Sequence, residues 1–490
     1  MFMNRIQIMT FSAGILLLVS CSGIPENPKE KNSLPPLFPD ITEVTIPLNI
    51  APLNFKTTSP AEKIILKIES GDEDLIVKGK DQIRIPAHSW RKLLERSAGG
   101  SLNLTIWMKE NDGWLKYTPF KIHVRKEPID PYLVYRRIAP GYEAWSEMGI
   151  YQRDLTSFRE STIIDNRLLP GNCMNCHSFN NNDPEQMMLH LRGNIGATML
   201  VSEGEVTKLN TRTKETGLNC VYPYWHPSGS FIAFSVNSIS QFFHTEKDKR
   251  IEVMDSRSDL VVLDIAAGKL LTTSLISEEG NFETFPVFSA DGKTLYFCSA
   301  PKATIPDDYN DIKYSLCSIS FDASSGTFGK SVDTLVSSHI TGKSISFPRT
   351  SHDGRYIMFT LSDYGNFSIW HREADLWLLS LADGSVKPLT SVNSGEADSY
   401  HSWSSDSRWF VFTSRRSDGL YSRPYFSWMD ENGQATKPFM LPQRNPDFYD
   451  YSFQSFNVPE LVTGKVNTDG RKMLKTIGSE AKSVTFEVKE

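Results

Sequence analysis

Apolar and polar positions alternate in four similar stretches between residues 222 and 414. Each begins with an aromatic residue, passes through a polar turn that ends in Gly or Ser, and continues as an alternating apolar run. A period of two is typical of a strand with one buried face. The stretches are "YPYWHPSGSFIAFS" (222–235), "FPVFSADGKTLYFCS" (285–299), "FPRTSHDGRYIMFTL" (347–361) and "YHSWSSDSRWFVFTS" (400–414).

A second alternating element follows each stretch and surrounds a Gly turn, which predicts a β-hairpin. These elements cover residues 258–274, 314–335, 374–390 and 425–441. Two strands plus a hairpin make four antiparallel strands per unit. Repetition of such units around an axis predicts a β-propeller.

The turn pattern x-S-x-D-G-[KR], followed by a hydrophobic-aromatic run, resembles the repeat of TolB-like propellers. It is complete at Gly292 and Gly354, whereas Ser228 replaces the Asp of the first repeat and Ser407 replaces the Gly of the fourth. Residues 196–210 resemble the hairpin half of another unit, which the C-terminal segment would complete. We therefore expect a mainly β fold with a TolB-like propeller of five or six blades over residues 196–490.

Shorter alternating runs fill residues 41–125 and are interrupted by one helix-like stretch at 89–99. This pattern predicts a small β-sandwich of immunoglobulin-like or fibronectin-like type. Its function cannot be inferred from the sequence.

The first residues have the pattern of an export signal. One positive charge at Arg5 precedes an apolar stretch from Ile6 to Val19, which is too short to span a membrane. The ending Leu-Val-Ser-Cys resembles a bacterial lipobox, which implies removal of residues 1–20 and acylation of Cys21. An ordinary secretory signal or a short membrane anchor is the alternative. Residues 21–40 are rich in Pro and Lys and are expected to form a flexible tether.

Composition narrows the class of protein only modestly. The chain has 490 residues, 39% hydrophobic and 22% charged, with a net charge of −6. These values are typical of a globular domain, and the acidic balance argues against a nucleic-acid partner. We expect an extracytoplasmic protein that its lipid holds on a bacterial membrane, and the outer membrane is favoured over the inner. The sequence does not distinguish the periplasmic side of that membrane from the cell surface.

Cys173, Cys176 and His177 form the motif C-x-x-C-H in "LLPGNCMNCHSFN". In this order two thiols can add to the vinyl groups of one haem while the adjacent imidazole reaches the iron from the proximal side. Zinc would need a second ligand pair, a thioredoxin-like redox pair would need a βαβ setting, and a structural disulfide remains an alternative. The sequence therefore predicts one covalently bound haem c, within a haem-binding segment at residues 126–195.

A second axial ligand is sought downstream, in "NDPEQMMLHLRG". Asp183 suits a helix N-cap, Pro184 the first helical position and Gly193 the stop, so a short α-helix is expected there. The distal candidates on this helix are Met188, Met187 and His190, with Met148 as a more remote one and core packing as the alternative.

Nearby arginines are candidates to pair with the haem propionates. They are Arg136, Arg137 and Arg153, with a solvated surface charge as the alternative for each.

Three further cysteines, Cys220, Cys298 and Cys317, complete the set of six. Cys298 and Cys317 lie in apolar runs and are expected to act as small buried hydrophobic residues. A disulfide between two of the three would also suit an oxidising compartment.

These features favour an electron carrier or redox sensor that works with an unidentified redox partner protein. The layout resembles lipoproteins of the Bacteroidota in which one C-x-x-C-H segment is joined to propeller repeats. One alternative is a scaffold that binds a protein or a glycan, with the haem secondary. The other is a sugar lyase with a metal held by His226, His352 and His401, although these occupy different repeat positions. A G-x-S-x-G motif is absent from the sequence, which argues against a serine peptidase.

Overall fold

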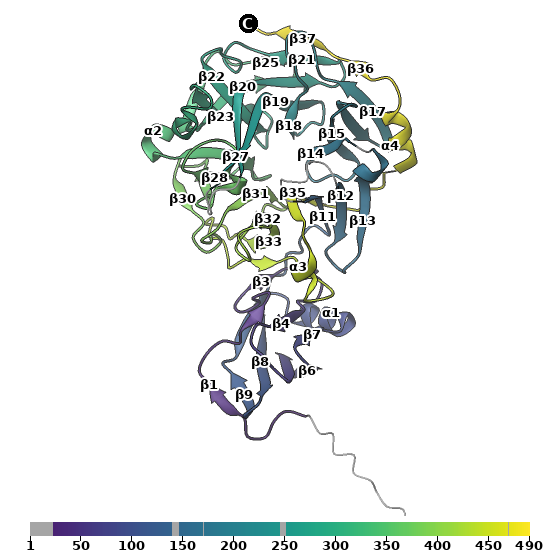
Figure 1. The fold of residues 1–490 in the computed structure, drawn as a ribbon, viewed down its shortest axis with the longest axis vertical. Coiled ribbons are helices and arrows are strands. Elements are labelled where there is room, and N and C mark those ends of the chain that lie inside the picture. The colour runs from purple at the N-terminus through teal and green to yellow at the C-terminus, as the bar shows by residue number, and fades with distance from the viewer. Residues whose placement is uncertain (1–22, 140–146, 170, 246–250, 469) are drawn as a thin grey trace, which may run out of the picture.

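The computed structural model describes residues 23–139, 147–169, 171–245, 251–468 and 470–490. Strands dominate this part of the chain, and the mainly β prediction is confirmed. Figure 1 shows two bodies, a smaller N-terminal module and a larger group of sheets around a common centre.

The N-terminal module holds two sheets and one helix. The larger sheet has the order β1-β9-β8-β10-β3, with β5 pairing β8 and β6. Its strands are β1 (Lys29–Lys31), β3 (Thr45–Ile46), β5 (Lys63–Ser70), β6 (Glu73–Gly79), β8 (Ser101–Glu110), β9 (Gly113–Tyr117) and β10 (Phe120–Val124). The smaller sheet consists of β2 (Leu37–Phe38), β4 (Phe55–Thr57) and β7 (Gln82–Ile83).

Helix α1 (Ala87–Arg96) follows β7 and buries Trp90, Leu93 and Leu94. The helix expected at 89–99 is thus confirmed with slightly earlier bounds. The tether prediction is wrong for much of residues 21–40, because β1 pairs with β9 and β2 with β4. Backbone pairing to later strands gives these residues order that their composition does not suggest.

Six further sheets make up the larger body, and each has one strand nearest the common centre. Two of the sheets are built mainly from residues before the four sequence repeats, and each adds one strand from the C-terminal part of the chain. The first contains β11 (Tyr132–Ile138), β12 (Met148–Asp154), β13 (Glu160–Asp165) and β35 (Ser455–Val462). The second contains β14 (Cys173–Phe179), β15 (Gln186–Arg192), β16 (Ala197–Ser202), β17 (Glu205–Asn210) and β36 (Lys482–Ser483).

The four sequence repeats each form one of the remaining sheets, as their alternation predicts. The first contains β18 (Val221–Trp225), β19 (Phe231–Phe243), β20 (Ile251–Asp264), β21 (Lys269–Thr272) and β37 (Thr485–Val488). The second contains β22 (Asn281–Phe288), β23 (Thr294–Pro301), β24 (Ser315–Asp322), β25 (Thr327–Phe328) and β26 (Asp333–Val336). The third contains β27 (Ser344–Thr350), β28 (Tyr356–Ser362), β29 (Asp375–Ser380) and β30 (Val386–Pro388). The fourth contains β31 (Asp398–Trp403), β32 (Trp409–Ser414), β33 (Arg423–Trp428) and β34 (Phe439–Met440).

The innermost strands of the six sheets contact one another in turn. β14 contacts β18, β18 contacts β22, β22 contacts β27, β27 contacts β31, β31 contacts β35, and β35 contacts β14. The last sheet joins both ends of the larger body, since β35 pairs with β11 from far earlier in the chain. The expectation that the C-terminal segment completes the sheet of residues 196–210 is therefore wrong for β35.

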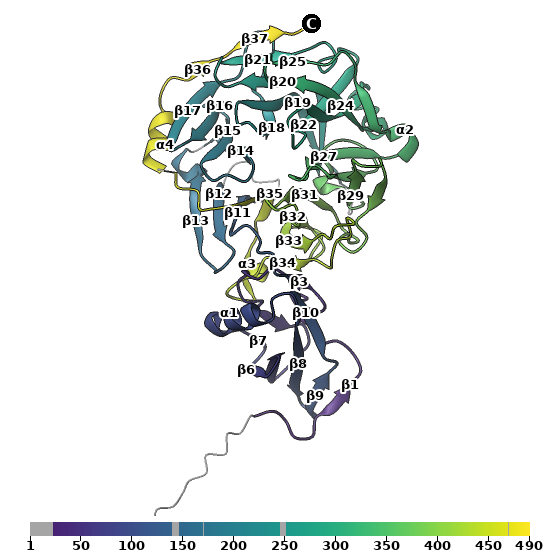
Figure 2. The same cartoon turned by 180° about the vertical axis from the view of Figure 1, so that it is seen from behind.

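The last residues of the chain do pair with the sheet that contains residues 196–210, at its outer edge. After helix α4 (Gly470–Ile477), β36 lies parallel to β17 and β37 lies parallel to β21. Figure 2 shows this C-terminal strap along the edge farthest from the N-terminal module. The strap covers the outer backbone edges of two neighbouring sheets.

In the region expected to be an α-helical haem-binding segment, the described residues form strands and one short 3-10 helix (Asn166–Leu168). β15 occupies the stretch expected as a helix and pairs with β14 on one side and β16 on the other. A domain boundary after residue 195 is also inconsistent with this sheet, because residues 173–210 supply four of its strands. Apolar side chains on both faces of β15 made the periods of helix and strand hard to distinguish.

One structural irregularity recurs at the same place in all six innermost strands. In each, two residues lie opposite one residue of the neighbouring strand, which is a β-bulge. The bulged pairs are Cys176–His177, Tyr222–Pro223, Phe285–Pro286, Phe347–Pro348, Tyr400–His401 and Val458–Pro459. The register of the sheets therefore aligns the C-x-x-C-H motif with the first aromatic residue of each repeat.

Candidate functional site

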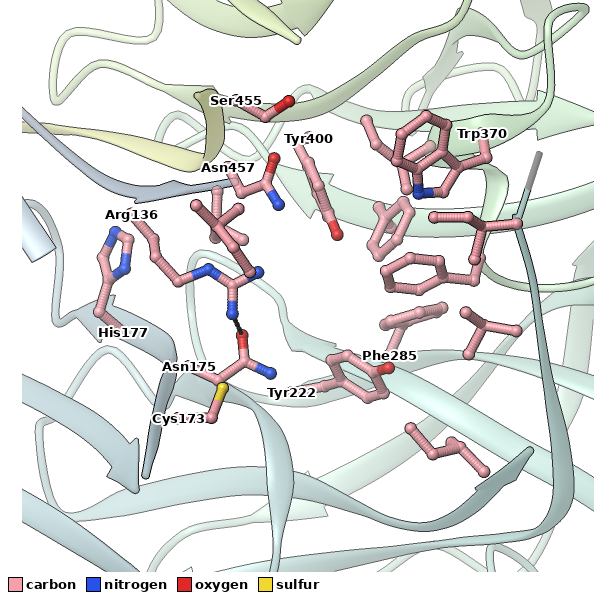
Figure 3. Close-up of a pocket in the computed structure, with 18 of the residues that line it drawn as sticks. Arg136, Cys173, Asn175, His177, Tyr222, Phe285, Trp370, Tyr400, Ser455 and Asn457 are labelled. Carbon is pink, nitrogen blue, oxygen red and sulfur yellow. Dashed lines mark hydrogen bonds between the residues drawn. The ribbon is translucent and has the colours of Figure 1, made fainter. Parts of the chain in front are cut away.

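A cavity of about 240 Å³ lies where the innermost strands meet. Figure 3 shows its lining side chains, which come from all six sheets around the centre. Because ligands bind preferentially in such concave, mostly apolar sites with a few polar groups, we take it as the candidate functional site. We call it the central pocket.

Aromatic rings from the bulges form one wall of the central pocket. The ring centroids of Tyr222 and Phe285 are 4.5 Å apart, those of Phe285 and Phe347 4.4 Å, and those of Phe347 and Tyr400 4.9 Å. All four residues have φ between 47° and 51°, a left-handed conformation that is uncommon for residues other than Gly. We call these four rings the aromatic arc, and it gives the pocket a broad apolar surface.

Four arginines line the central pocket, and no Asp or Glu does so among the described residues. The arginines are Arg136, Arg192, Arg349 and Arg415. The guanidinium of Arg415 lies 3.4 Å from the ring centroid of Trp370, and its Nε donates to the carbonyl of Ile369 at 2.8 Å. The pocket is therefore electropositive with aromatic walls, which suits a flat ligand that carries acidic groups.

Two members of the C-x-x-C-H motif reach this pocket. Cys173 and His177 both line it, and both are buried in strand β14. The side chain of Cys176 lies outside the described part of the structure, as does Cys21. In Figure 3, Arg136 and Asn175 lie between His177 and the middle of the pocket, and Arg136 donates to the Asn175 side chain.

The imidazole of His177 is an unusual buried group. It is 2% exposed, and its ring nitrogens face the backbone groups of Val134 and Val458 without well-formed hydrogen bonds. Burial, together with the charge of Arg136, lowers the pKa of His177 to about 3, so the ring is neutral at physiological pH. A neutral imidazole is the form of histidine that binds a metal ion. The residues present therefore fit a haem held by the motif, with arginines for its propionates.

The proposed distal ligands lie elsewhere. Met187 and Met188 are fully buried on opposite faces of β15, in two different hydrophobic cores. His190 lies 3.4 Å from the Thr198 hydroxyl through its Nδ1, and burial lowers its pKa to about 3. The sulfur of Met148 accepts from the N–H of Met174 at 3.4 Å. None of the four lines the central pocket, because a strand directs these side chains between the sheets.

Only one of the three arginines considered from the sequence faces the pocket. Arg136 lines it, whereas Arg137 pairs with Glu160 at 3.2 Å and Arg153 donates to the carbonyl of Pro442 at 2.8 Å. Sequence reasoning missed Arg192, Arg349 and Arg415, which come from three other parts of the chain. The aromatic arc did have a sequence signal, the aromatic residue at the start of each repeat.

The histidines of the lyase alternative do not converge. His226 Nε2 lies 3.0 Å from the carbonyl of Gly292, and His401 Nε2 lies 2.9 Å from that of Met358. His352 lines a separate, smaller cavity. Within the described residues, no group of three or more His, Cys, Asp or Glu side chains could hold a metal ion.

The remaining described cysteines pack as buried side chains outside the central pocket. Cys220, Cys298 and Cys317 are buried free thiols, and burial raises the pKa of Cys220 to about 12 and that of Cys317 to about 11. The expectation of small buried hydrophobic residues is confirmed for Cys298 and Cys317, and no disulfide joins the three.

Comparison with known proteins gives weak structural similarities alone. No family model and no curated protein matches the chain. Prolyl oligopeptidase B from Galerina marginata, bound to a 35mer substrate, matches 69% of this chain and 42% of its own, with 10% identity and a TM-score of 0.34. A candidate 6-phosphogluconolactonase from Bacteroides fragilis matches 64% of this chain and 96% of its own, with 10% identity and a TM-score of 0.33. Dipeptidyl peptidase 4 from Porphyromonas gingivalis matches 64% and 52%, with 10% identity and a TM-score of 0.27.

This chain thus spans less than half of the first of these structures, and we transfer no activity from any of them. In the part of the chain that the structure describes, no helix has the length and apolar character needed to cross a membrane.

Proposed function

We propose that this chain is an extracytoplasmic c-type cytochrome with one haem in the central pocket of a six-bladed β-propeller. Cys173 and Cys176 would hold the porphyrin through thioether bonds, and His177 would bind the iron. The group would supply one-electron exchange with a redox partner protein. Lipid on Cys21 would keep the protein on a bacterial membrane, as the sequence predicts.

One observation carries the proposal: Cys173 and the buried imidazole of His177, two members of one C-x-x-C-H motif, both line an aromatic pocket with four arginines. Four guanidinium groups on a pocket with no acidic group among its described lining residues would attract the propionates of a haem. The aromatic arc would cover the apolar porphyrin plane. The six sheets, whose innermost strands contact in turn, support the propeller assignment.

This proposal assigns no second side chain to the iron. The described pocket residues include no methionine and no second histidine. We therefore expect that Met187→Ala and Met188→Ala leave the absorption spectrum of the haem protein unchanged. A shift of the haem bands in either variant would support the methionine as an iron ligand and would contradict its position outside the central pocket.

The decisive experiment uses the full chain, exported from cells that carry c-type haem maturation machinery. A pyridine haemochrome spectrum should show one c-type haem, and the intact mass should exceed that of the bare polypeptide by one haem. The Cys173→Ser/Cys176→Ser variant should lose both signals, whereas Cys317→Ser, a buried thiol outside the pocket, should retain them. A colourless wild-type protein of bare polypeptide mass would overturn the proposal.

A further inference from the structure

A second, smaller cavity of about 50 Å³ lies at the other end of the innermost strands. Along β14, Cys173 and His177 line the central pocket, whereas Ser178 and Phe179 line the second cavity. Arg349 of β27 lines both and so stands between them. The second cavity has room for one or two water molecules, and its walls are largely polar.

Glu460 is the acidic residue that lines this second cavity among the described residues. It lies on β35, two residues beyond the bulge residue Val458, which lines the central pocket. Its Oε2 accepts a hydrogen bond from the backbone N–H of Phe179 at 3.0 Å. The carboxyl group thus lies on the wall of the second cavity, which Arg349 also lines, and faces a space that can hold water.

The charged and titratable groups around Glu460 come from three other strands and the turn after one of them. Arg349 of β27 stabilises the carboxylate by its positive charge. Tyr224 of β18 donates to or accepts from the Thr350 hydroxyl at 3.2 Å, and burial raises its pKa. His352, just after β27, and His401 of β31 have their pKa values lowered by burial and are neutral at pH 7. Burial raises the pKa of Glu460 to about 7, which leaves it as the group here that titrates near neutral pH.

We propose that Glu460 takes up a proton through the second cavity when the neighbouring central pocket gains an electron. The inference rests on the proposed haem function. In the step, a one-electron reductant would add one electron to the central pocket, and a hydronium ion that reaches the second cavity from bulk water would give its proton to the carboxylate. One O–H bond of the hydronium ion breaks, one O–H bond forms on Glu460, and a water molecule is left. Oxidation reverses both transfers.

The physical reason is reciprocal coupling. Reduction removes one positive charge from the central pocket, so a neighbouring carboxylate holds a proton more tightly. By linkage, protonation of that carboxylate makes the pocket easier to reduce by the same free energy. Arg349, which faces both cavities, carries part of this coupling.

The test is a spectroelectrochemical titration of the haem protein between pH 5 and pH 9. In the wild type, the midpoint potential should fall with rising pH over part of this range, with a slope approaching 59 mV per tenfold change in proton concentration. Glu460→Gln should flatten that slope, whereas Glu480→Gln, at an exposed position, should retain it. Glu460→Asp, which keeps an acid, should recover part of it.

A second measurement needs no variant. Infrared difference spectra of the wild type at pH 7 should show a protonated-carboxyl band that grows on reduction. Absence of haem in the wild type would overturn the proposed function itself. Haem with a pH-independent potential and no carboxyl band, or with the same slope in Glu460→Gln, would overturn this inference alone.

Discussion

The carboxylate of Asp130 accepts hydrogen bonds from both the backbone N–H of Ser405, at 2.8 Å, and its hydroxyl, at 2.6 Å. The two residues lie 275 positions apart in the chain. Asp130 ends the link from the N-terminal module, and Ser405 lies in the turn between β31 and β32. The contact is partly buried and belongs to a continuous interface, since one hydrophobic core includes residues of both bodies.

Ser405→Ala should weaken this junction. It leaves the buried Asp130 with one donor fewer, and an unsatisfied buried acceptor costs about 1–3 kcal/mol. The free energy of unfolding, measured in urea, should fall by that amount, whereas Asp112→Ala at an exposed turn should change it little. Equal stability of wild type and Ser405→Ala would show that the hydrogen bonds contribute nothing net.

Two glycines at the same repeat position should differ in their tolerance of alanine. Gly292 and Gly354 have φ of 74° and 71°, so each Ala variant carries a backbone strain of about 1–2 kcal/mol. A Cβ at Gly292 would lie 2.2 Å from His226 Nε2, whereas a Cβ at Gly354 would meet no atom closer than 3.5 Å. Gly292→Ala should therefore cost about 1–3 kcal/mol more than Gly354→Ala in thermal or urea unfolding. Similar losses would mean that His226 moves aside freely.

Glu283 should make stability depend on pH. It is 1% exposed and its Oε2 has no partner, and burial raises its pKa from the ordinary 4.5 to about 8. A raised folded-state pKa means that the unfolded chain releases the proton first, so stability falls as pH rises from about 4.5 to about 8 and then levels. Glu283→Gln should remove this loss and exceed the wild type by about 2–4 kcal/mol at pH 9.

The same comparison at pH 4 should show little difference, because both side chains are then neutral. Glu279→Gln, at an exposed position in the preceding turn, is the matched control and should leave the pH profile unchanged. A Glu283→Gln variant with the wild-type profile would place the titration elsewhere.

Removal of the C-terminal strap should loosen two sheets and spare the others. Truncation of residues 482–490 deletes β36 and β37 and exposes the outer edges of β17 and β21, which lose the pairs Leu209–Lys482 and Leu270–Phe486. Hydrogen exchange should accelerate in β17 and β21, because exposed edge amides open more readily. The edge strands β30 and β34 serve as internal controls. Uniform acceleration over all sheets would show that the strap acts on global stability instead.

Local patterns accounted for much of the strand content but not for the pairing. The four repeats predicted the two inner strands of four sheets, because alternation and turn residues are local properties of the chain. The pairing of β11 with β35 joins residues more than three hundred positions apart, and no local pattern encodes such a contact. The stretch around Met187 and His190 was predicted as a helix because capping residues flank it. Hydrogen bonding to two neighbouring strands overrode that local preference.

The features of the candidate site also fall into those that the sequence predicts and those that depend on the tertiary structure. The sequence alone determined the motif of Cys173, Cys176 and His177, the aromatic residue at the start of each repeat and the apolar run from Ile6 to Val19, because each is a matter of residue identity and spacing. Tertiary structure decided that Arg136, Arg192, Arg349 and Arg415 meet around one pocket, that Glu460 stands beside it, and that the methionines of β15 face away. Those outcomes depend on the register and order of six sheets around one centre, and register is set by packing and backbone pairing between distant segments.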